Sequence, residues 1–315
     1  MSALGSVTGR RVLVTGGDGL IGRAVVRRLA AAGALVTALD RSADDAARRA
    51  DEAGAVSYRQ ASVTDEAAVL DAIAGQDAVV HLAGIPGLGF TGPGEIYAAN
   101  ALGTFLVLNA AAEAGLAKAV FASSINAFGL PLNAQPVLPS RYPWDEDEPA
   151  DIGDPYSLSK QANEAAAVAI ARWSGLAVTG LRYPLVRDIR AEGGRAFARH
   201  IRAALRGDPR RQACEGWTYL DVTDAAEATL AALTHETPPG PGILVAAPNT
   251  YLRQDTEDAL EQIAPAVPRE RFERREVPVR LDRAVNLLGF TAAVLLEDVD
   301  PTLLADLSGR DEGTA

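Results

Sequence analysis

Cysteine and histidine are scarce in this sequence. One cysteine, Cys214, and three histidines stand among 315 residues. A single thiol cannot close an internal disulfide, and the histidines are too scattered for the usual Cys/His zinc site. The sequence therefore predicts neither a disulfide scaffold nor a metal site.

Long apolar runs and a basic excess are missing as well. No apolar stretch approaches the ~18 residues of a membrane span, and residues 1–10 lack the apolar region of a signal peptide. The formal net charge of −11 disfavours nucleic-acid and anionic-membrane partners, because both need a basic field. We expect a soluble, cytoplasmic protein that acts on a small-molecule substrate.

The chain does have a folded-core composition, with 48% hydrophobic residues, and a regular alternation of strand and helix patterns. Strands are predicted at 11–15, 34–39, 55–60, 77–82, 117–123 and 177–181. Helices are predicted at 20–32, 44–53, 65–74 with Thr64 as its cap, 95–115 and 156–173. Strands separated by helices predict an α/β fold with a doubly wound parallel sheet.

A glycine-rich turn joins the first strand to the first helix, in Thr15-Gly-Gly-Asp-Gly-Leu-Ile-Gly22. Glycines permit the tight turn and let the backbone approach a pyrophosphate, which the N–H groups of the helix N-terminus can bind. The motif fits the Rossmann spacing from Gly17 and the short-chain dehydrogenase spacing from Gly16. We expect a dinucleotide to bind at Gly16, Gly19, Leu20, Ile21 and Gly22.

Asp40 ends the second strand, where a carboxylate accepts hydrogen bonds from the adenosine ribose and repels a 2′-phosphate. This position favours NAD as the cofactor. The adjacent Arg41 could bind a 2′-phosphate if Asp40 turned away, so NADP stays open as the less favoured alternative.

Tyr156 and Lys160 stand four residues apart, on one face of a predicted helix. A phenol with a pKa of ~10 is a poor base at neutral pH, but a nearby cation lowers that pKa. Lys160 is one of only two lysines among 30 Lys and Arg residues, so a lysine here calls for a functional reason. We expect Tyr156 to act as a general acid/base.

Together these motifs resemble the extended short-chain dehydrogenase/reductase family, whose members include NAD-dependent epimerases and dehydratases. The resemblance covers about residues 10–250. Besides the glycine turn and Tyr156-x-x-x-Lys160, it rests on His81-Leu-Ala-Gly84, Asn100-Ala-Leu-Gly-Thr104, Phe121-Ala-Ser-Ser124, Leu181-Arg-Tyr-Pro184 and Tyr219-Leu-Asp-Val-Thr-Asp224.

The resemblance implies roles for individual residues. Ser124 would hydrogen-bond the reacting oxygen, Lys160 would hold the nicotinamide ribose, and Asn100 would order the helix that carries the proton relay. The cofactor would also be bordered by Ser62, Val63, Leu82, Ala83, Gly84, Tyr183 and Val186. A homodimer through a four-helix bundle is implied too, in keeping with apolar residues on several faces of the helices from Glu95 and Tyr156.

Departures from the family pattern narrow the reaction. Ile125 and Asn126 stand where dehydratases carry Asp-Glu, and neither can carry a proton at pH 7. Asn126 also stands where some epimerases use Cys. The 4-epimerases need no extra base, but they typically present an Arg to the substrate diphosphate where this chain has Trp217.

Uronate dehydrogenases share the spacing from Ser123 to Gly129 and act on substrates without a diphosphate. We therefore expect an NAD-dependent dehydrogenase or reductase for a sugar-like or small polar substrate without a nucleotide diphosphate, contacted by Ser124, Asn126 and a stacking Trp217. A nucleotide-sugar 4-epimerase with retained NAD and a non-catalytic NAD(P)-sensing module remain alternatives.

The pattern loosens after Pro184. We expect residues 1–185 to form the NAD-binding Rossmann domain, with 218–233 and 243–247 returning to it. Residues 186–315 would form a smaller substrate-binding domain with a disordered tail. Arg195, Arg199, Arg202 and Arg206 recur at helical spacing and could meet an anionic substrate, although a solvated helix face is favoured. The acidic run 144–148 is expected to be a solvated loop.

Overall fold

The computed structural model describes residues 4–41, 55–135 and 137–299. The helix expected at 44–53 and the polar tail lie outside the described residues. Within them, the main sheet has the order β3-β2-β1-β4-β5-β6-β9, and every neighbouring pair is parallel. Its strands are β1 Arg11–Thr15, β2 Leu35–Asp40, β3 Val56–Gln60, β4 Ala78–His81, β5 Lys118–Ser124, β6 Ala177–Tyr183 and β9 Ile243–Leu244. The predicted doubly wound α/β fold is confirmed.

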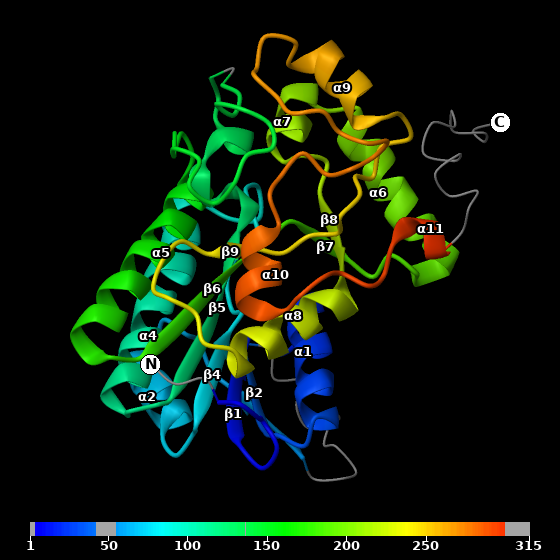
Figure 1. Cartoon of the computed structure of the whole chain (residues 1–315). Helices are drawn as coiled ribbons and strands as arrows, with labels where there is room; N and C mark the ends of the chain where they lie inside the picture. Colours follow the sequence, from blue (N-terminus) through cyan, green and yellow to red (C-terminus); the bar gives the residue numbers. More distant parts are fainter. Residues whose placement is uncertain (1–3, 42–54, 136, 300–315) are drawn as a thin grey trace, which may run out of the picture.

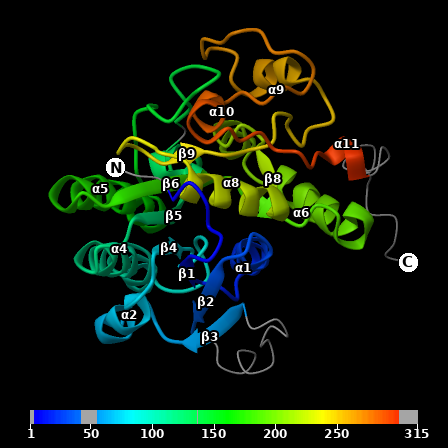
Figure 2. The ribbon, with the colours of Figure 1, turned by 60° about the horizontal axis from the view of Figure 1, so that its bottom comes forward.

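Helices cover both faces of this sheet (Figures 1 and 2). One face packs against α1 (Leu20–Ala31) and α8 (Val222–Thr234), and the other against α2 (Glu66–Ile73), α4 (Gly103–Glu113) and α5 (Pro155–Ser174). Because side chains alternate along a strand, Val12 and Val14 enter the core on the α1 side, whereas Leu13 enters the core on the α2 side. Apolar residues on both faces explain why the strands read as continuous apolar runs.

Two helix predictions need correction. The helix expected at 95–115 extends from Pro93 to Glu113 with right-handed helical backbone at each junction, and it contains a π-helical turn at Ala98–Leu102 between α3 (Pro93–Tyr97) and α4. In this turn the Asn100 side chain bonds the backbone of Ile85. The cap of α2 is Asp65, whose carboxylate accepts from the N–H of Ala68 at 3.1 Å, and not Thr64.

The C-terminal half adds a second, two-stranded sheet. It is formed by β7 (Leu185–Arg187) and β8 (Tyr219–Asp221). Residues 218–233, expected to return to the Rossmann domain, contribute to two places: β8 pairs with β7 in the second sheet, and α8 packs against α1. Of the strands described after β6, β9 joins the main sheet, where it pairs with β6. The other elements are α6 (Arg195–Leu205), α7 (Pro209–Cys214), α9 (Thr256–Ile263), α10 (Asp282–Leu288), α11 (Leu296–Val299) and short 3₁₀ turns at Ile125–Phe128, Leu130–Leu132 and Ala191–Gly194. None of the helices described is both long and apolar enough to span a membrane.

Candidate active site

A cavity of about 1240 Å³ lies where the strands of the main sheet end. In open α/β sheets, ligands bind outside the carboxyl ends of the strands. The cavity brings together every residue expected to bind the cofactor, and three expected to act on the substrate (Ser124, Asn126 and Tyr156): Gly16, Gly19, Leu20, Ile21, Gly22, Asp40, Arg41, Ser62, Val63, Leu82, Ala83, Gly84, Ser124, Asn126, Tyr156, Lys160, Tyr183 and Val186.

The glycine turn forms a backbone cradle at one end of the cavity. Gly16 has a φ of +69°, and a Cβ on it would lie 2.6 Å from the backbone nitrogen of Ala83. A Cβ on Gly22 would overlap the carbonyl oxygen of Gly16. Only glycine allows this close approach, which leaves the first N–H groups of α1 open to a phosphate. These residues fit a dinucleotide.

The carboxylate of Asp40 is fixed toward this turn. One oxygen accepts from the N–H of Asp18 at 3.0 Å, and the other from the N–H of Arg41 at 2.7 Å. Asp40 lines the cavity and does not turn away from it. The side chain of Arg41 is exposed at the cavity rim. This arrangement suits a ribose with free hydroxyl groups.

Tyr156 lies in the first turn of α5, whose N-terminus is capped by Asp154 through the N–H of Ser157 at 2.8 Å. Burial raises the pKa of the Tyr156 phenol, and a hydrogen bond with Ser124 lowers it. Asp154 and Glu215 raise the pKa further through their negative charge. Ser124 and Tyr156 both line the cavity.

Lys160 lies one helical turn beyond Tyr156. Its Nζ is 5.7 Å from the Tyr156 ring centroid and donates to the carbonyl of Ala122 at 2.9 Å. Burial lowers the pKa of Lys160 to about 8, with the charge of Glu164 opposing the shift. At neutral pH the ammonium form predominates, so Lys160 can stabilise a phenolate at Tyr156.

Asn100 is buried and lies behind the cavity wall. Its side chain accepts from the N–H of Ile85 at 2.7 Å and donates to Ser159 Oγ at 3.2 Å. Ser159 Oγ in turn donates to the carbonyl of Tyr156 at 2.7 Å. Asn100 thus joins the π-helical turn to the start of α5 and is placed to position Tyr156.

The prediction that Trp217 stacks on a substrate is wrong. Its side chain is 1% exposed and packs in the core, and it does not line the cavity. The backbone at Trp217 is left-handed, with a φ of +49°, and its neighbours Glu215 and Thr218 line the cavity instead. From its place in the sequence, Trp217 could pack in the core or contact a ligand. The conformation of the turn decides which of the two occurs.

Several lining residues were missed by the sequence analysis. They come from β7, α6, α7 and the segment after β9, and they share polar side chains: Arg187, His200, Arg211, Gln212, Glu215 and Tyr251. Arg211 pairs with Glu215 at 3.3 Å, and burial raises the pKa of Glu215. No local motif marks them, because separate elements bring them together. We call this wall the substrate side of the cavity.

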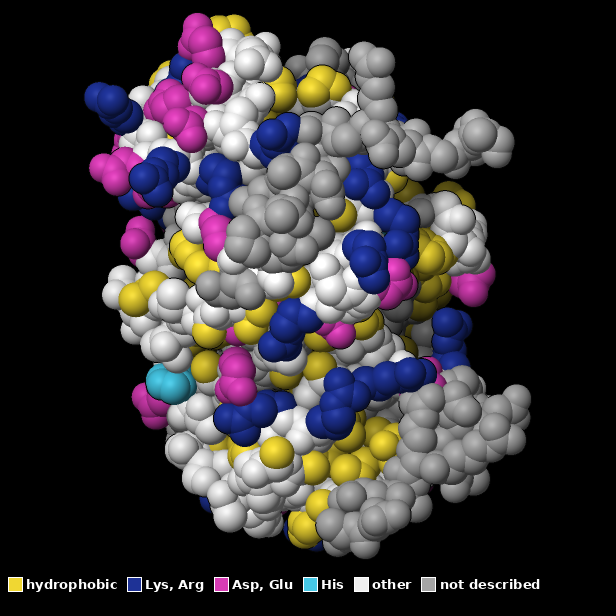
Figure 3. Space-filling model, turned by 90° about the vertical axis from the view of Figure 1, so that its right-hand side faces the viewer, with side chains coloured by type: hydrophobic (Ala, Val, Ile, Leu, Met, Phe, Trp, Pro, Cys, Tyr) yellow, Lys and Arg dark blue, Asp and Glu magenta, His cyan; other side chains and the backbone are white. Residues whose placement is uncertain are grey.

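The arginine stripe of α6 does not line the cavity. Arg195, Arg199 and Arg206 are exposed, and Arg199 pairs with Glu192 at 2.9 Å. Instead, His200, Ala203 and Ala204 face the cavity from α6, while Phe197 and Ile201 pack into the core. Figure 3 shows that basic and acidic side chains are interspersed on the side of the molecule that carries α6 and α11 in Figure 1.

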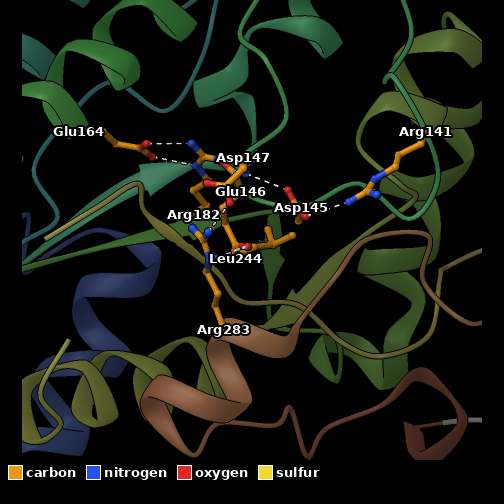
Figure 4. Close-up of polar contacts among 8 residues, drawn as sticks. All are labelled: Arg141, Asp145, Glu146, Asp147, Glu164, Arg182, Leu244 and Arg283. Carbon is orange, nitrogen blue, oxygen red and sulfur yellow. Dashed lines mark hydrogen bonds and ion pairs between the residues drawn. The ribbon is translucent and has the colours of Figure 1, made fainter. Parts of the chain in front are cut away.

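The acidic run 144–148 is only in part a solvated loop. Glu146 is buried, and its carboxylate accepts from the N–H of Leu244 in β9 at 2.9 Å (Figure 4). Arg182 of β6 donates to both carboxylate oxygens of Glu164, at 2.9 and 2.8 Å, and to the carbonyl of Glu146 at 3.1 Å. Arg283 lies between Glu146 and the exposed Asp147. The network therefore ties the loop to α5, β6, β9 and α10.

Sequence comparison agrees with this geometry. The sequence model of the NAD-dependent epimerase/dehydratase family matches residues 12–247. The chain belongs to this family. The resemblance to extended short-chain dehydrogenases/reductases is thereby confirmed at the level of the family, and with it the NAD-binding Rossmann fold.

Individual relatives of this family member differ in their chemistry. Cinnamoyl-CoA reductase 1 of Petunia hybrida is 30% identical over 276 residues, which are 84% of this chain and 80% of the relative. UDP-glucose 4-epimerase 4 of Oryza sativa subsp. japonica is 33% identical over 172 residues, 51% of this chain and 44% of the relative. Family membership therefore leaves the reaction open.

Solved structures share the fold of this epimerase/dehydratase family member. A short-chain dehydrogenase/reductase superfamily protein of Agrobacterium tumefaciens with bound NAD has a TM-score of 0.68 at 23% identity, covering 94% of this chain and 96% of that one. MoeE5 in complex with UDP-glucuronic acid and NAD has a TM-score of 0.65 at 23% identity, covering 94% and 98%. NAD is bound in both, in agreement with the predicted cofactor.

Proposed function

We propose that this protein is an NAD-dependent dehydrogenase or reductase that interconverts a secondary alcohol and a carbonyl group on a sugar-like or small polar substrate. The observation that carries the proposal is the meeting of Ser124, Tyr156 and Lys160 in the cavity that also holds the glycine cradle and Asp40. A module that only sensed the nucleotide would have no need of a proton relay.

The chain's own residues would handle the proton. NAD, held by the glycine turn and Asp40, would supply or accept the hydride. Ser124 donates a hydrogen bond to the reacting oxygen, and Tyr156 moves the proton to or from that oxygen. Lys160 stabilises the phenolate form of Tyr156 with its charge. Asn100 positions Tyr156 through Ser159.

The residues beside Ser124 favour simple oxidation or reduction over dehydration. Ile125 and Asn126 line the cavity without a titratable group. Two carboxylates line the cavity on the substrate side, and each is paired with an arginine, Glu215 with Arg211 and Asp208 with Arg210. The spacing from Ser123 to Gly129, which uronate dehydrogenases share, supports a simple oxidation or reduction as well.

A nucleotide-sugar 4-epimerase is the second candidate. The rice relative and MoeE5 support it, since the first is named for this reaction and the second is bound to UDP-glucuronic acid. The burial of Trp217 weakens the argument against a diphosphate, because this position does not face the cavity. The expectation that the substrate lacks a diphosphate remains a prediction.

One assay separates the two candidates. Purified protein is given NAD and a panel of sugars, uronates, polyols and nucleotide sugars, and absorbance at 340 nm is followed beside product analysis. Net NADH formation supports the dehydrogenase, whereas epimerised nucleotide sugar without net NADH supports the epimerase. Calorimetric titration of UDP and dTDP into the NAD-loaded protein provides a second measurement, in which tight binding would count against the dehydrogenase.

A further inference from the structure

Arg187, at the end of β7, is a half-buried guanidinium on the substrate side of the cavity. Its Nη1 donates to the carbonyl of Val186 at 2.8 Å. In the described part of the chain, no Asp or Glu side chain forms an ion pair with it. Neighbouring arginines differ, since Arg190 pairs with Asp221 at 3.3 Å and Arg211 pairs with Glu215 at 3.3 Å.

His200 of α6 also lines the cavity. Burial lowers the pKa of His200, and the positive charge of Arg187 lowers it further, which places the imidazole within electrostatic reach of the guanidinium. Neither ring nitrogen has a hydrogen-bond partner among the residues the structure describes. A guanidinium with several free N–H donors and a neighbouring imidazole N–H together suit an oxygen-bearing anion.

A half-buried charge without a counterion costs free energy, and burial lowers the pKa of Arg187 with no carboxylate to oppose the shift. An anion bound at Arg187 would remove that cost. The cofactor's phosphates do not explain it, because the glycine cradle follows β1, whereas Arg187 lies beyond the end of β6, and β4 and β5 stand between these strands in the sheet. Arg187 is the last residue of β7, which follows β6 in the chain and precedes α6.

We propose that Arg187 and His200 form a binding site for an oxyanion of the substrate, a carboxylate or a phosphate group. The inference rests on the proposed function in that the ligand is the substrate of the Tyr156 site. The inference adds the chemical class of the substrate, which is a molecule that carries an oxyanion. A bidentate guanidinium contact would also orient the substrate, so that one hydroxyl or carbonyl oxygen faces Ser124 and Tyr156.

The test measures binding, independently of turnover. NAD-loaded protein is titrated calorimetrically with D-glucuronate, D-glucose 6-phosphate, UDP and the uncharged D-glucose. The wild type is expected to bind at least one of the three anionic probes about 10-fold or more tightly than glucose. Whichever probe binds identifies the oxyanion as a carboxylate, a phosphate monoester or a diphosphate. Equal affinity for glucose and all three anionic probes would overturn the proposal.

Two substitutions assign the effect to Arg187. Arg187→Met should weaken binding of the preferred anion by about 10- to 100-fold, since charge-assisted hydrogen bonds are lost. Arg195→Met removes the same charge from an exposed position outside the cavity lining and should change nothing. Arg187→Lys, which keeps the charge but not the fork, should fall between wild type and Arg187→Met, and it decides the matter if the Met variant does not fold.

Other outcomes count against the site. Unchanged anion binding by Arg187→Met would overturn it, and so would a 10-fold loss of NAD affinity with anion preference retained, because the guanidinium would then serve the cofactor. Arg187-dependent anion binding by a protein that forms no NADH would overturn the dehydrogenase and keep this site. If NADH forms only from uncharged substrates, and Arg187→Met does not change the rate, the dehydrogenase is kept and the oxyanion site is overturned.

Discussion

At the scale of single residues, Tyr156 is subject to opposing influences. Burial and the charges of Asp154 and Glu215 raise the pKa of its phenol, while the hydrogen bond with Ser124 lowers it. The Lys160 ammonium, 5.7 Å from the ring centroid, adds a favourable charge for the phenolate. A phenol in this setting can release and recover a proton during turnover.

Replacing Tyr156 by Phe should abolish nearly all turnover and leave NAD affinity within a few-fold of wild type. The phenol moves the proton, whereas the contacts to the phosphates and the adenosine ribose lie elsewhere. Steady-state rates and calorimetric NAD titration measure the two effects. Tyr97→Phe, which removes an exposed hydroxyl outside the cavity lining, is the control. A Tyr156→Phe variant that kept more than about a tenth of the wild-type rate would refute the role.

Asp40 should make NAD the preferred cofactor over NADP. Its carboxylate, held by the N–H groups of Asp18 and Arg41, accepts from ribose hydroxyls and repels a 2′-phosphate. We expect Asp40→Ala to lower kcat/KM for NAD and to raise it for NADP, because Arg41 remains at the rim. If the wild type already prefers NADP, Arg41 decides the choice of cofactor at the adenosine ribose. Asp40→Ala should then change kcat/KM little for either cofactor.

At the scale of elements, the Glu164–Arg182 pair joins α5 to β6 in the core. Arg182→Met should lower the free energy of unfolding by about 3 kcal/mol, because the buried carboxylate of Glu164 loses its bidentate partner and keeps only the Ser123 hydroxyl and the charge of Lys160. The double variant Glu164→Leu with Arg182→Met should be less destabilised than Arg182→Met alone. Urea unfolding measures both. A double variant as unstable as the sum of the two single variants would show that the pair is not coupled.

Local patterns carried enough information for the strand and helix alternation, the glycine turn and the Tyr156–Lys160 spacing. Each depends on residues close together in the sequence. The bonds of Asn100 to Ile85, the burial of Glu146 and the burial of Trp217 depend on partners outside the local pattern. The substrate side was missed for the same reason, since Arg187, His200 and Glu215 meet only after β7, α6 and α7 have packed.

At the scale of the whole molecule, α3, α4 and α5 expose apolar side chains that a second copy of the chain could cover. Leu158 is 48% exposed, Leu102 46% and Tyr97 42%. Ile170 of α5, by contrast, lies in the core. Exposed leucines on neighbouring helices favour association.

We predict a homodimer through this face. Sedimentation at micromolar concentration should give twice the chain mass for the wild type, and the mass of one chain for Leu102→Glu combined with Leu158→Glu. Val285→Glu places a negative charge on a 49% exposed apolar site of α10 and should leave the dimer intact. A monomeric wild type would contradict the prediction.

The placement of β9 has a consequence for how the chain is made. β6 pairs with β9 through Leu181 with Ile243 and Arg182 with Leu244, although the loops, helices and second sheet between them must be synthesised first. Until residue 244 leaves the ribosome, β6 is an open sheet edge that can pair with other chains. Glu146 is synthesised before β9, and its carboxylate accepts a hydrogen bond from the N–H of Leu244 only once β9 has been made. A nascent chain stalled before that point should be the most prone to aggregate.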